Sequence, residues 1–103
     1  MPRRPLDKKL ACFATDRITV DGCPVGYMYR EPPDNDVDSG WRFLAGDESD
    51  EYMEDASNLA LYDVDTIANH DPSIVPFLDE SAGAAFERDD GGELVRVPGP
   101  NAN

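Results

Sequence analysis

The sequence predicts a single small α+β domain, built on a mostly antiparallel sheet with two short helices. Its length of 103 residues suits one domain, since domains typically contain roughly 100–150 residues. Short runs in which apolar and polar residues alternate are typical of strands that bury one face. Turn residues separate these runs, and Asp89-Asp90-Gly91-Gly92 between two apolar runs is a strong hairpin signal.

The first predicted strands lie in residues 10–30. The apolar run 10–14 suits a strand, and it is followed by residues 15–20 and a turn at Asp21-Gly22. Residues 25–30 alternate with a period of two, which lets a strand bury one face. Pro32-Pro33 ends this strand, because proline cannot donate a hydrogen bond to a neighbouring strand.

A return strand is predicted after an acidic loop. Residues 34–40 are polar and show no periodicity, so we expect a loop. Residues 41–44 then form the strand that pairs with residues 25–30, with Trp41 and Phe43 on one face. The two strands make a hairpin with a long acidic connection.

Short helices are predicted in the middle of the chain. Residues 47–55 suit a helix whose start is capped by Asp47 or Ser49 and whose first turn carries carboxylates. Residues 59–64 read as a further strand, and residues 65–68 as a turn of helix.

The last predicted elements are a helix and a hairpin. Apolar residues at helical spacing place a helix at 73–78, and Pro76 is compatible with it only if the helix begins near Ser73. Residues 84–88 and 93–97 flank the Asp-Gly turn and form the closing hairpin.

The charge of the chain is strongly negative and unevenly distributed. It contains 22 Asp and Glu residues against 9 Lys and Arg, for a net charge of −13 at pH 7. Residues 1–9 carry +3, whereas residues 31–71 carry −12. A negative surface repels nucleic-acid phosphates and anionic membranes. The composition therefore argues against nucleic acid and membranes as partners and favours a basic protein.

Composition also predicts the domain boundaries. Residues 1–9 are predicted to be a flexible basic N-terminus, residues 10–97 the single folded domain, and residues 98–103 a flexible tail. No apolar run approaches the roughly 20 residues of a membrane span. The first ten residues also lack the apolar stretch of a secretory signal. We therefore expect a cytoplasmic protein; its oligomeric state is left open.

The cysteines and the histidine do not predict a catalytic centre. Cys12 and Cys23 are expected to be free, as thiols are in a reducing compartment. A Cys–His dyad would have to use His70, but nothing near either cysteine in the sequence indicates an activated thiolate. We expect His70 to be hydrogen-bonded locally at a turn or helix end.

The acidic residues after Pro33 resemble the start of a calcium-binding loop, but the rest of the loop pattern is missing. Asp34, Asp36 and Asp38 alternate as at the start of such a loop, but the required glycine is replaced by Ser39 and the bidentate glutamate by Ala45. The chain has no glycine-rich phosphate loop, no CxxC pair and no nucleophile elbow. We predict no catalytic residues, no metal, no cofactor and no enzymatic activity.

A partner-binding surface is the remaining prediction. Six carboxylates occur within residues 47–55, shortly after two aromatic residues. Apolar anchors supply affinity, and surrounding charge of one sign supplies steering and selectivity. The predicted partner-binding residues are Asp34, Asp36, Asp38, Trp41, Asp47, Glu48, Asp50, Glu51, Glu54 and Asp55. The alternative is that Trp41 and Phe43 lie in the core, as large aromatics on strands usually do, with the acids as a solvated rim.

Several motifs resemble one bacterial family. The stretches VGYMYRE at 25–31 and DSGWRFLAGDE at 38–48, with similar stretches at 61–74 and 85–88, are similar to immunity protein family number thirty-three of polymorphic toxin systems, formerly a domain of unknown function. The likeness extends over residues 12–97. It implies a small cytosolic protein that binds and neutralises a cognate or neighbouring toxin domain, and it implies no catalytic residues.

Charge and resemblance together suggest a stoichiometric toxin inhibitor. Toxins that attack nucleic acid are often basic where they hold it, so the acidic residues 34–55 could cover such a surface. One alternative is a regulatory or adaptor module that binds a small ligand or a protein beside the strands of Tyr27, Tyr29 and Trp41. The other is a small hydrolase or metal-dependent enzyme, which would need a deep pocket with buried carboxylates and His70.

Overall fold

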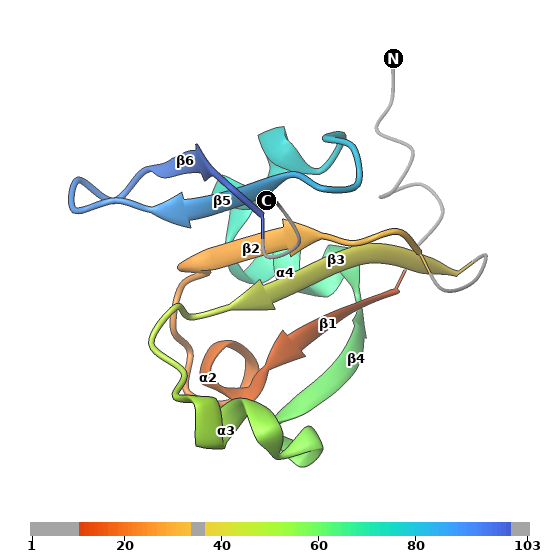
Figure 1. Ribbon diagram of the computed structural model, residues 1–103, viewed down its shortest axis with the longest axis vertical. Helices are drawn as coiled ribbons and strands as arrows, with labels where there is room; N and C mark the ends of the chain where they lie inside the picture. Colours follow the sequence, from red (N-terminus) through yellow and green to blue (C-terminus); the bar gives the residue numbers. More distant parts are fainter. Residues whose placement is uncertain (1–10, 34–36, 100–103) are drawn as a thin grey trace.

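A six-stranded sheet forms the centre of the computed structural model, which describes residues 11–33 and 37–99 (Figure 1). The strands are β1 (Ala11–Thr15), β2 (Tyr27–Arg30), β3 (Asp38–Leu44), β4 (Leu59–Asp63), β5 (Ala85–Arg88) and β6 (Leu94–Val97). The helical segments described are α2 (Asp16–Thr19), α3 (Asp50–Glu54), η1 (Ala56–Asn58), α4 (Val64–His70) and η2 (Pro72–Phe77).

The strand order is β4-β1-β3-β2-β5-β6. All neighbouring strands are antiparallel except β1 and β3, which run parallel. The predicted hairpins β2–β3 and β5–β6 are both present, and the backbone N–H of Asp89 donates to the carbonyl of Glu93 where the second one closes, at 2.8 Å. The α+β class and the mostly antiparallel sheet are therefore confirmed.

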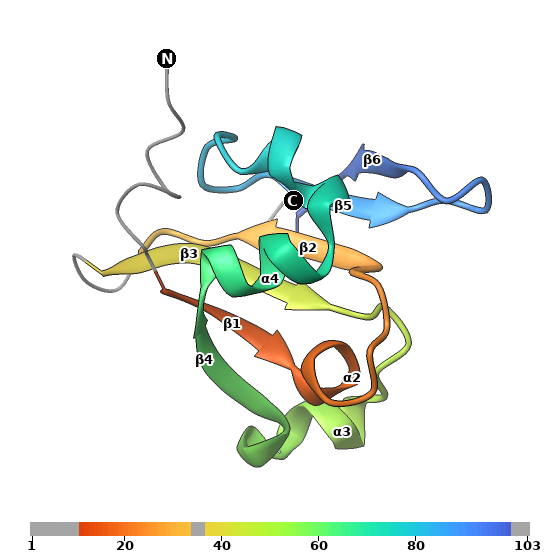
Figure 2. The ribbon, with the colours of Figure 1, turned by 180° about the vertical axis from the view of Figure 1, so that it is seen from behind.

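The hydrophobic core lies between the sheet and the segments α2, α4 and η2. Figure 2 shows α4 in front of β2 and β3, with the η2 segment continuing beyond it. The helical side of the core is built from buried side chains of α2, α4 and η2, namely Ile18, Val64, Ile67, Ala68 and Ile74. From the sheet, Trp41 and Phe43 face this layer with their rings stacked, 6.0 Å apart and inclined by 15°. Their predicted position on one face of the strand is confirmed.

Strand β2 alternates as predicted, and Met28 is its core residue. Met28 is fully buried and pairs across the strands with Phe43 and Phe86. Tyr27 and Tyr29 point to the opposite face and are half-buried. The flexible, polarisable Met side chain fills the space between two aromatic rings.

Two glycines allow β2 and β3 to approach closely. A Cβ atom at Gly26 would lie 1.9 Å from the carbonyl oxygen of Ala45. At Gly40, where φ is +85°, a Cβ atom would lie 2.1 Å from the carbonyl oxygen of Glu31. No side chain fits at either position, and a positive φ further favours glycine at Gly40. These contacts explain why the VGYMYRE and DSGWRF stretches each contain a glycine.

Most helical segments lie where the sequence predicts a helix, but not all of them are α-helices. Within the predicted helix 47–55, Ser49 caps α3 by accepting the backbone N–H of Tyr52 at 3.1 Å. Pro76 lies inside η2, a 3-10 segment that begins at Pro72, so the predicted start near Ser73 is confirmed to within one residue. The sequence predicts no helix at α2, where residues 16–19 form one turn directly after β1 and bury Ile18.

Some predictions concern residues outside the described ranges. These are the flexible N-terminus 1–9, most of the tail 98–103, and the loop residues Asp34 and Asp36. Within residues 11–33 and 37–99, no helix has both the length and the apolar character needed to cross a bilayer.

Both cysteines are free, as predicted. Cys12 is fully buried, and burial raises the pKa of its thiol to about 12. Because the thiolate is the reactive form, we expect a thiol reagent to modify only Cys23 in the native protein and both cysteines after unfolding. A spectrophotometric thiol titration counts the reactive groups, and a native Cys23→Ser variant should show none. Fast modification of that variant would contradict the buried position of Cys12.

Candidate functional site

Figures 1 and 2 show α4 on one side of the sheet, and we call the face opposite α4 and η2 the open face. Strand pairing gives this face a row of mostly apolar side chains. Strand pairing places Leu61 of β4 opposite Phe13 of β1, and Phe13 opposite Arg42 of β3. Arg42 in turn pairs with Tyr29 of β2. Side chains directly opposite on one face of a sheet contact one another, so the row is continuous from β4 to β2.

An apolar groove of about 310 Å³ lies on the open face. The apolar groove is lined by Phe13, Tyr29, Arg42, Leu44, Met53 and Leu59. Met53 comes from α3, so this short helix forms one wall, and the strands supply the rest. Aromatic and Met side chains are enriched at protein interfaces, and a hollow between them can receive an apolar side chain of a partner.

Arg42 lines the groove, but its charge is neutralised inside the fold. Its side chain is 8% exposed and donates from Nη1 to Asp38 at 3.0 Å and from Nε to Glu31 at 2.9 Å. The guanidinium also lies 4.9 Å from the ring centre of Phe13. Burial tends to lower the pKa of Arg42, but the bonds to Asp38 and Glu31 outweigh it, and the pKa is raised.

Two tyrosines extend the aromatic surface beside the groove. The rings of Tyr27 and Tyr29 are 5.6 Å apart and inclined by 39°. Burial raises the pKa of both hydroxyl groups, with a further contribution from Glu87 at Tyr27 and from Glu31 at Tyr29. Both hydroxyl groups are therefore neutral at pH 7 and able to donate a hydrogen bond. Tyr offers a large apolar ring with a polar tip, which suits a protein interface.

Helix α3 places exposed carboxylates next to the groove. Asp50 and Glu51 are in its first turn and Glu54 is its last residue, and all three are exposed. Met53 of the same helix lines the groove. No ion pair joins these three carboxylates to another residue of the described ranges. They are available to a cation of a partner.

The described arginines are all held by internal acceptors. Carboxylates pair with Arg17, Arg42, Arg88 and Arg96, and Arg30 donates to the carbonyls of Ser39 and Glu80. Residues 11–33 and 37–99 contain no lysine. The positive side chains in this part of the chain therefore all bond acceptors of the same chain. The exposed carboxylates give the surface a negative potential.

Asp47 and Glu48, two of the predicted contact residues, have structural partners. Arg17 donates to Asp47 at 2.6 Å, and this bond lowers the pKa of Asp47. Glu48 accepts from the hydroxyl of Thr15 at 2.6 Å and from the backbone N–H of Ala45 at 2.7 Å. These bonds fix the loop between β3 and α3.

The other predicted aspartates are placed differently. Asp55 is exposed at the end of α3, and hydrogen bonds from Ser57 lower its pKa. Asp38, the third member of the calcium-like pattern, binds Arg42. Asp34 and Asp36 lie outside the described residues. The structure thus brings Asp50, Glu51, Glu54 and Asp55 together at one exposed place.

Trp41 is a core residue, which corrects its inclusion among the partner contacts. Its side chain is fully buried, and its indole N–H donates to the carbonyl of Leu78 at 3.2 Å. It therefore cannot touch a partner in this conformation. The alternative reading, in which a large strand aromatic faces inward, is the one that the structure shows.

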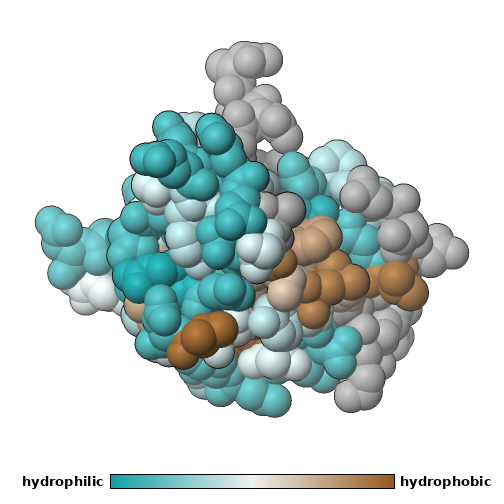
Figure 3. Space-filling view, turned by 90° about the horizontal axis from the view of Figure 1, so that it is seen from below, coloured by the Kyte–Doolittle hydropathy of each residue, from teal (hydrophilic) through white to brown (hydrophobic). Residues whose placement is uncertain are grey.

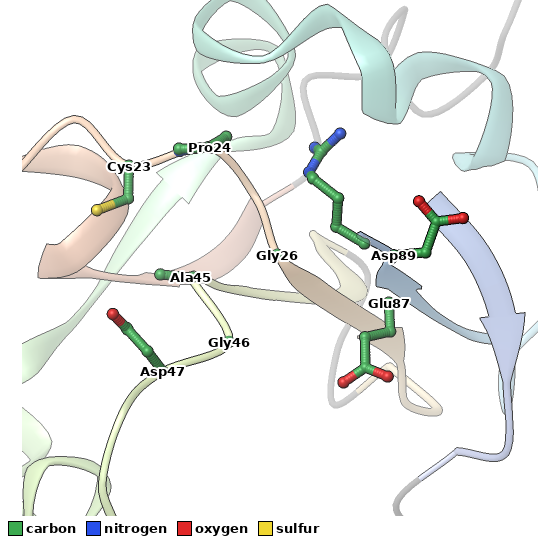
Figure 4. A pocket seen from close by; sticks show the side chains of 9 residues that line it. Cys23, Pro24, Gly26, Ala45, Gly46, Asp47, Glu87 and Asp89 are labelled. Carbon is green, nitrogen blue, oxygen red and sulfur yellow. The ribbon is translucent and has the colours of Figure 1, made fainter. Parts of the chain in front are cut away.

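A second hollow, of about 430 Å³, lies where the ends of β2, β3 and β5 meet. Figure 4 shows Asp47 on one side of it and Glu87 and Asp89 on the other. Asp47 is bound by Arg17, and Asp89 accepts the backbone N–H of Glu93 at 2.9 Å. Two of the three carboxylates are thus engaged within the fold.

His70 and Cys23 are close, but the contact is to the backbone. Nε2 of His70 lies 3.0 Å from the carbonyl oxygen of Cys23. The predicted helix-end position of His70 is confirmed, whereas the prediction of a local hydrogen bond is wrong, because this contact joins distant parts of the chain. Across residues 11–33 and 37–99, no group of three or more His, Cys, Asp or Glu residues is arranged to hold a metal ion.

Sequence reasoning missed most of the groove. Phe13, Leu44, Met53 and Leu59 come from β1, β3, α3 and β4, and no local pattern joins four such elements. The one available signal in the sequence is the alternation of residues around Tyr29, which predicts β2. The alternative function inferred from the sequence, a regulatory or adaptor module, predicts a pocket beside β2 and β3. The groove lies there, although β3 contributes Arg42 and Leu44 instead of Trp41.

A known family model matches most of the chain. The model of the Immunity protein Imm33 domain matches residues 12–98, which include nearly the whole sheet and all the groove residues. The range agrees with the resemblance over residues 12–97. Neither the comparison with curated proteins nor that with solved structures gave a match.

Proposed function

The chain belongs to the Imm33 family of immunity proteins, and on this basis we propose that it neutralises a toxin domain by binding it in the cytoplasm. In this proposal the protein occupies a surface of the toxin stoichiometrically and performs no reaction of its own. The toxin surface is basic, and the acidic part of the immunity protein around α3 covers it.

The negative surface around α3 is the observation that supports a basic partner. Asp50, Glu51 and Glu54 are exposed beside an apolar groove, while each described arginine bonds an acceptor of the same chain. Apolar contacts in the groove would supply affinity, and the carboxylates would steer the partner and reject acidic competitors. Steering of this kind weakens as salt screens the charges, with a screening length of about 8 Å at physiological ionic strength.

Capture of the partner from the producing cell tests the proposal directly. The tagged protein should co-purify with the toxin encoded beside its gene in a 1:1 complex, and its expression should protect cells from that toxin. The measurements are mass spectrometry of the captured complex, its mass in solution and the survival of toxin-expressing cells. No complex and no protection would rule out the proposed function.

The charges on α3 should control the rate of association. Replacing Asp50→Asn and Glu54→Gln together should lower the association rate about tenfold at low salt, because two steering charges are lost. The matched control is Asp90→Asn with Glu93→Gln, which removes the same charges from the exposed β5–β6 turn, far from α3 (Figure 1). Surface plasmon resonance at several salt concentrations measures both. Equal rates for the two variants, or rates that do not depend on salt, would exclude this role of α3.

A further inference from the structure

Strand β4 is an edge of the described sheet. The strand order places β4 at one end and β6 at the other, and β4 pairs only with β1 in that order. An edge strand has backbone N–H and C=O groups on its outer side that can pair with a strand from another chain. Its five residues, Leu59–Asp63, are enough for a short intermolecular pairing.

The side chains beside this edge are apolar. Leu61 is 61% exposed, and Leu59, two residues earlier on the same face, lines the apolar groove. Leu61 pairs with Phe13, which also lines the groove. Figure 3 looks toward this edge and shows an apolar area over and beside β4. The groove therefore continues to the edge of the sheet.

The two edges differ in how they are protected. Natural proteins protect exposed edge strands with charged residues and proline. Strand β6 contains Arg96, which is paired with Glu80, and it is followed by Pro98. Strand β4 has no proline and no basic residue, and its only charge is Asp63 at its last position. An unprotected apolar edge is expected where a partner covers it.

The charges at the two ends of β4 indicate the chemistry of that partner. The exposed Asp63 ends the strand, and the exposed Glu54 and Asp55 precede it, separated only by η1. A segment paired with β4 would meet carboxylates at both ends and apolar side chains between them. This pattern favours a strand whose apolar residues are flanked by Lys or Arg.

We propose that a strand of the toxin partner, apolar in its centre and basic at its ends, pairs with β4 and packs its apolar side chains on Leu59 and Leu61. This inference rests on the proposed function and specifies the mode of binding. The main-chain hydrogen bonds extend the sheet by one strand. The apolar side chains on the open face continue the groove, and the basic ends contact Asp63 and Asp55.

A second copy of the same chain fits this edge less well. Two chains that each carry a net charge of −13 repel one another. Antiparallel pairing of two β4 strands would also bring Asp63 of each copy near the acidic residues that precede β4 in the other. Charge complementarity therefore selects a basic strand over a homodimer.

Two matched variants compare the two edges in the complex with the captured toxin. Leu61→Lys places a cation on the β4 edge and should weaken toxin binding by at least about tenfold, because it removes an apolar contact and repels the basic partner. Val95→Lys makes the same kind of change on β6, where Val95 is also exposed, and should change affinity less than about twofold. Circular dichroism and thermal unfolding check that both variants fold. Unchanged affinity of Leu61→Lys with a toxin that the wild type binds would overturn the inference and leave the proposed function standing.

A peptide probe tests the edge without the toxin. The probe is a nine-residue peptide with two lysines at each end and isoleucine alternating with threonine between them, and the control has glutamates in place of the lysines. Amide hydrogen exchange should slow at β4 with the lysine peptide, while β6 and the control peptide show no change. Protection at β6 alone, or at neither edge, would contradict the inference. A wild-type dimer in sedimentation analysis that becomes monomeric in Leu61→Lys would replace the toxin strand with a second copy as the occupant.

Discussion

Replacing Arg42 with methionine should lower the free energy of unfolding by about 3–5 kcal/mol, because it removes the positive partner of a buried ion pair. Methionine retains much of the apolar stem and its packing on Phe13. The change therefore isolates the loss of the guanidinium that bonds Asp38 and Glu31. Denaturant unfolding followed by circular dichroism measures the effect.

The control for Arg42 is an exposed ion pair of similar chemistry. Arg96 pairs with Glu80, and the two side chains are 58% and 41% exposed, so Arg96→Met should lower the free energy of unfolding by at most about 1 kcal/mol. Adding Asp38→Asn and Glu31→Gln to Arg42→Met should recover part of the loss, since the two carboxylates that bonded Arg42 are neutralised. Equal losses for Arg42→Met and Arg96→Met would show that the Arg42 pair is not buried as described.

Trp41→Ala should also destabilise the protein by about 3–5 kcal/mol, as expected when a large buried aromatic is truncated. The indole is fully buried, stacks on Phe43 and donates to the carbonyl of Leu78. Because Trp41 is the only tryptophan, its fluorescence disappears in the variant, and unfolding has to be followed by circular dichroism.

A conservative variant separates the core role of Trp41 from a contact role. Trp41→Phe keeps a buried ring and should remain folded, with a smaller loss of stability and an unchanged affinity for the toxin. Val20→Ala is the exposed control, since Val20 is 73% exposed, and it should change stability by less than about 0.5 kcal/mol. A strong loss of toxin affinity in folded Trp41→Phe would indicate that Trp41 reaches the interface.

Local signals in the sequence predict much of the sheet. The turn at Asp89-Asp90-Gly91-Gly92 predicts the β5–β6 hairpin, and the alternation in residues 25–30 predicts β2. Both patterns act over a few residues, because side chains alternate along a strand and glycine permits a tight turn. The Ser49 cap of α3 is also a signal that acts over only a few residues.

Contacts between distant segments are the part that sequence does not predict. Nothing near Ala11 indicates that β1 runs parallel to β3 between that strand and β4. The groove depends on that arrangement, because it brings Phe13 beside Arg42. Trp41 shows a further limit, since an aromatic among acidic residues has the same sequence pattern in a core and at an interface. Only its burial in the folded protein separates the two.

The pairing of β1 with β4 and of β2 with β5, strands far apart in the sequence, has a consequence for how the protein forms during translation. Ala11 of β1 pairs with Asp63 of β4, and Tyr27 of β2 pairs with Glu87 of β5. The sheet therefore closes only after most of the chain has left the ribosome, and folds dominated by such distant pairings form slowly. A newly made chain should thus pass through a period in which β1 and β2 have been made but the strands they pair with, β4 and β5, have not, when aggregation competes with folding.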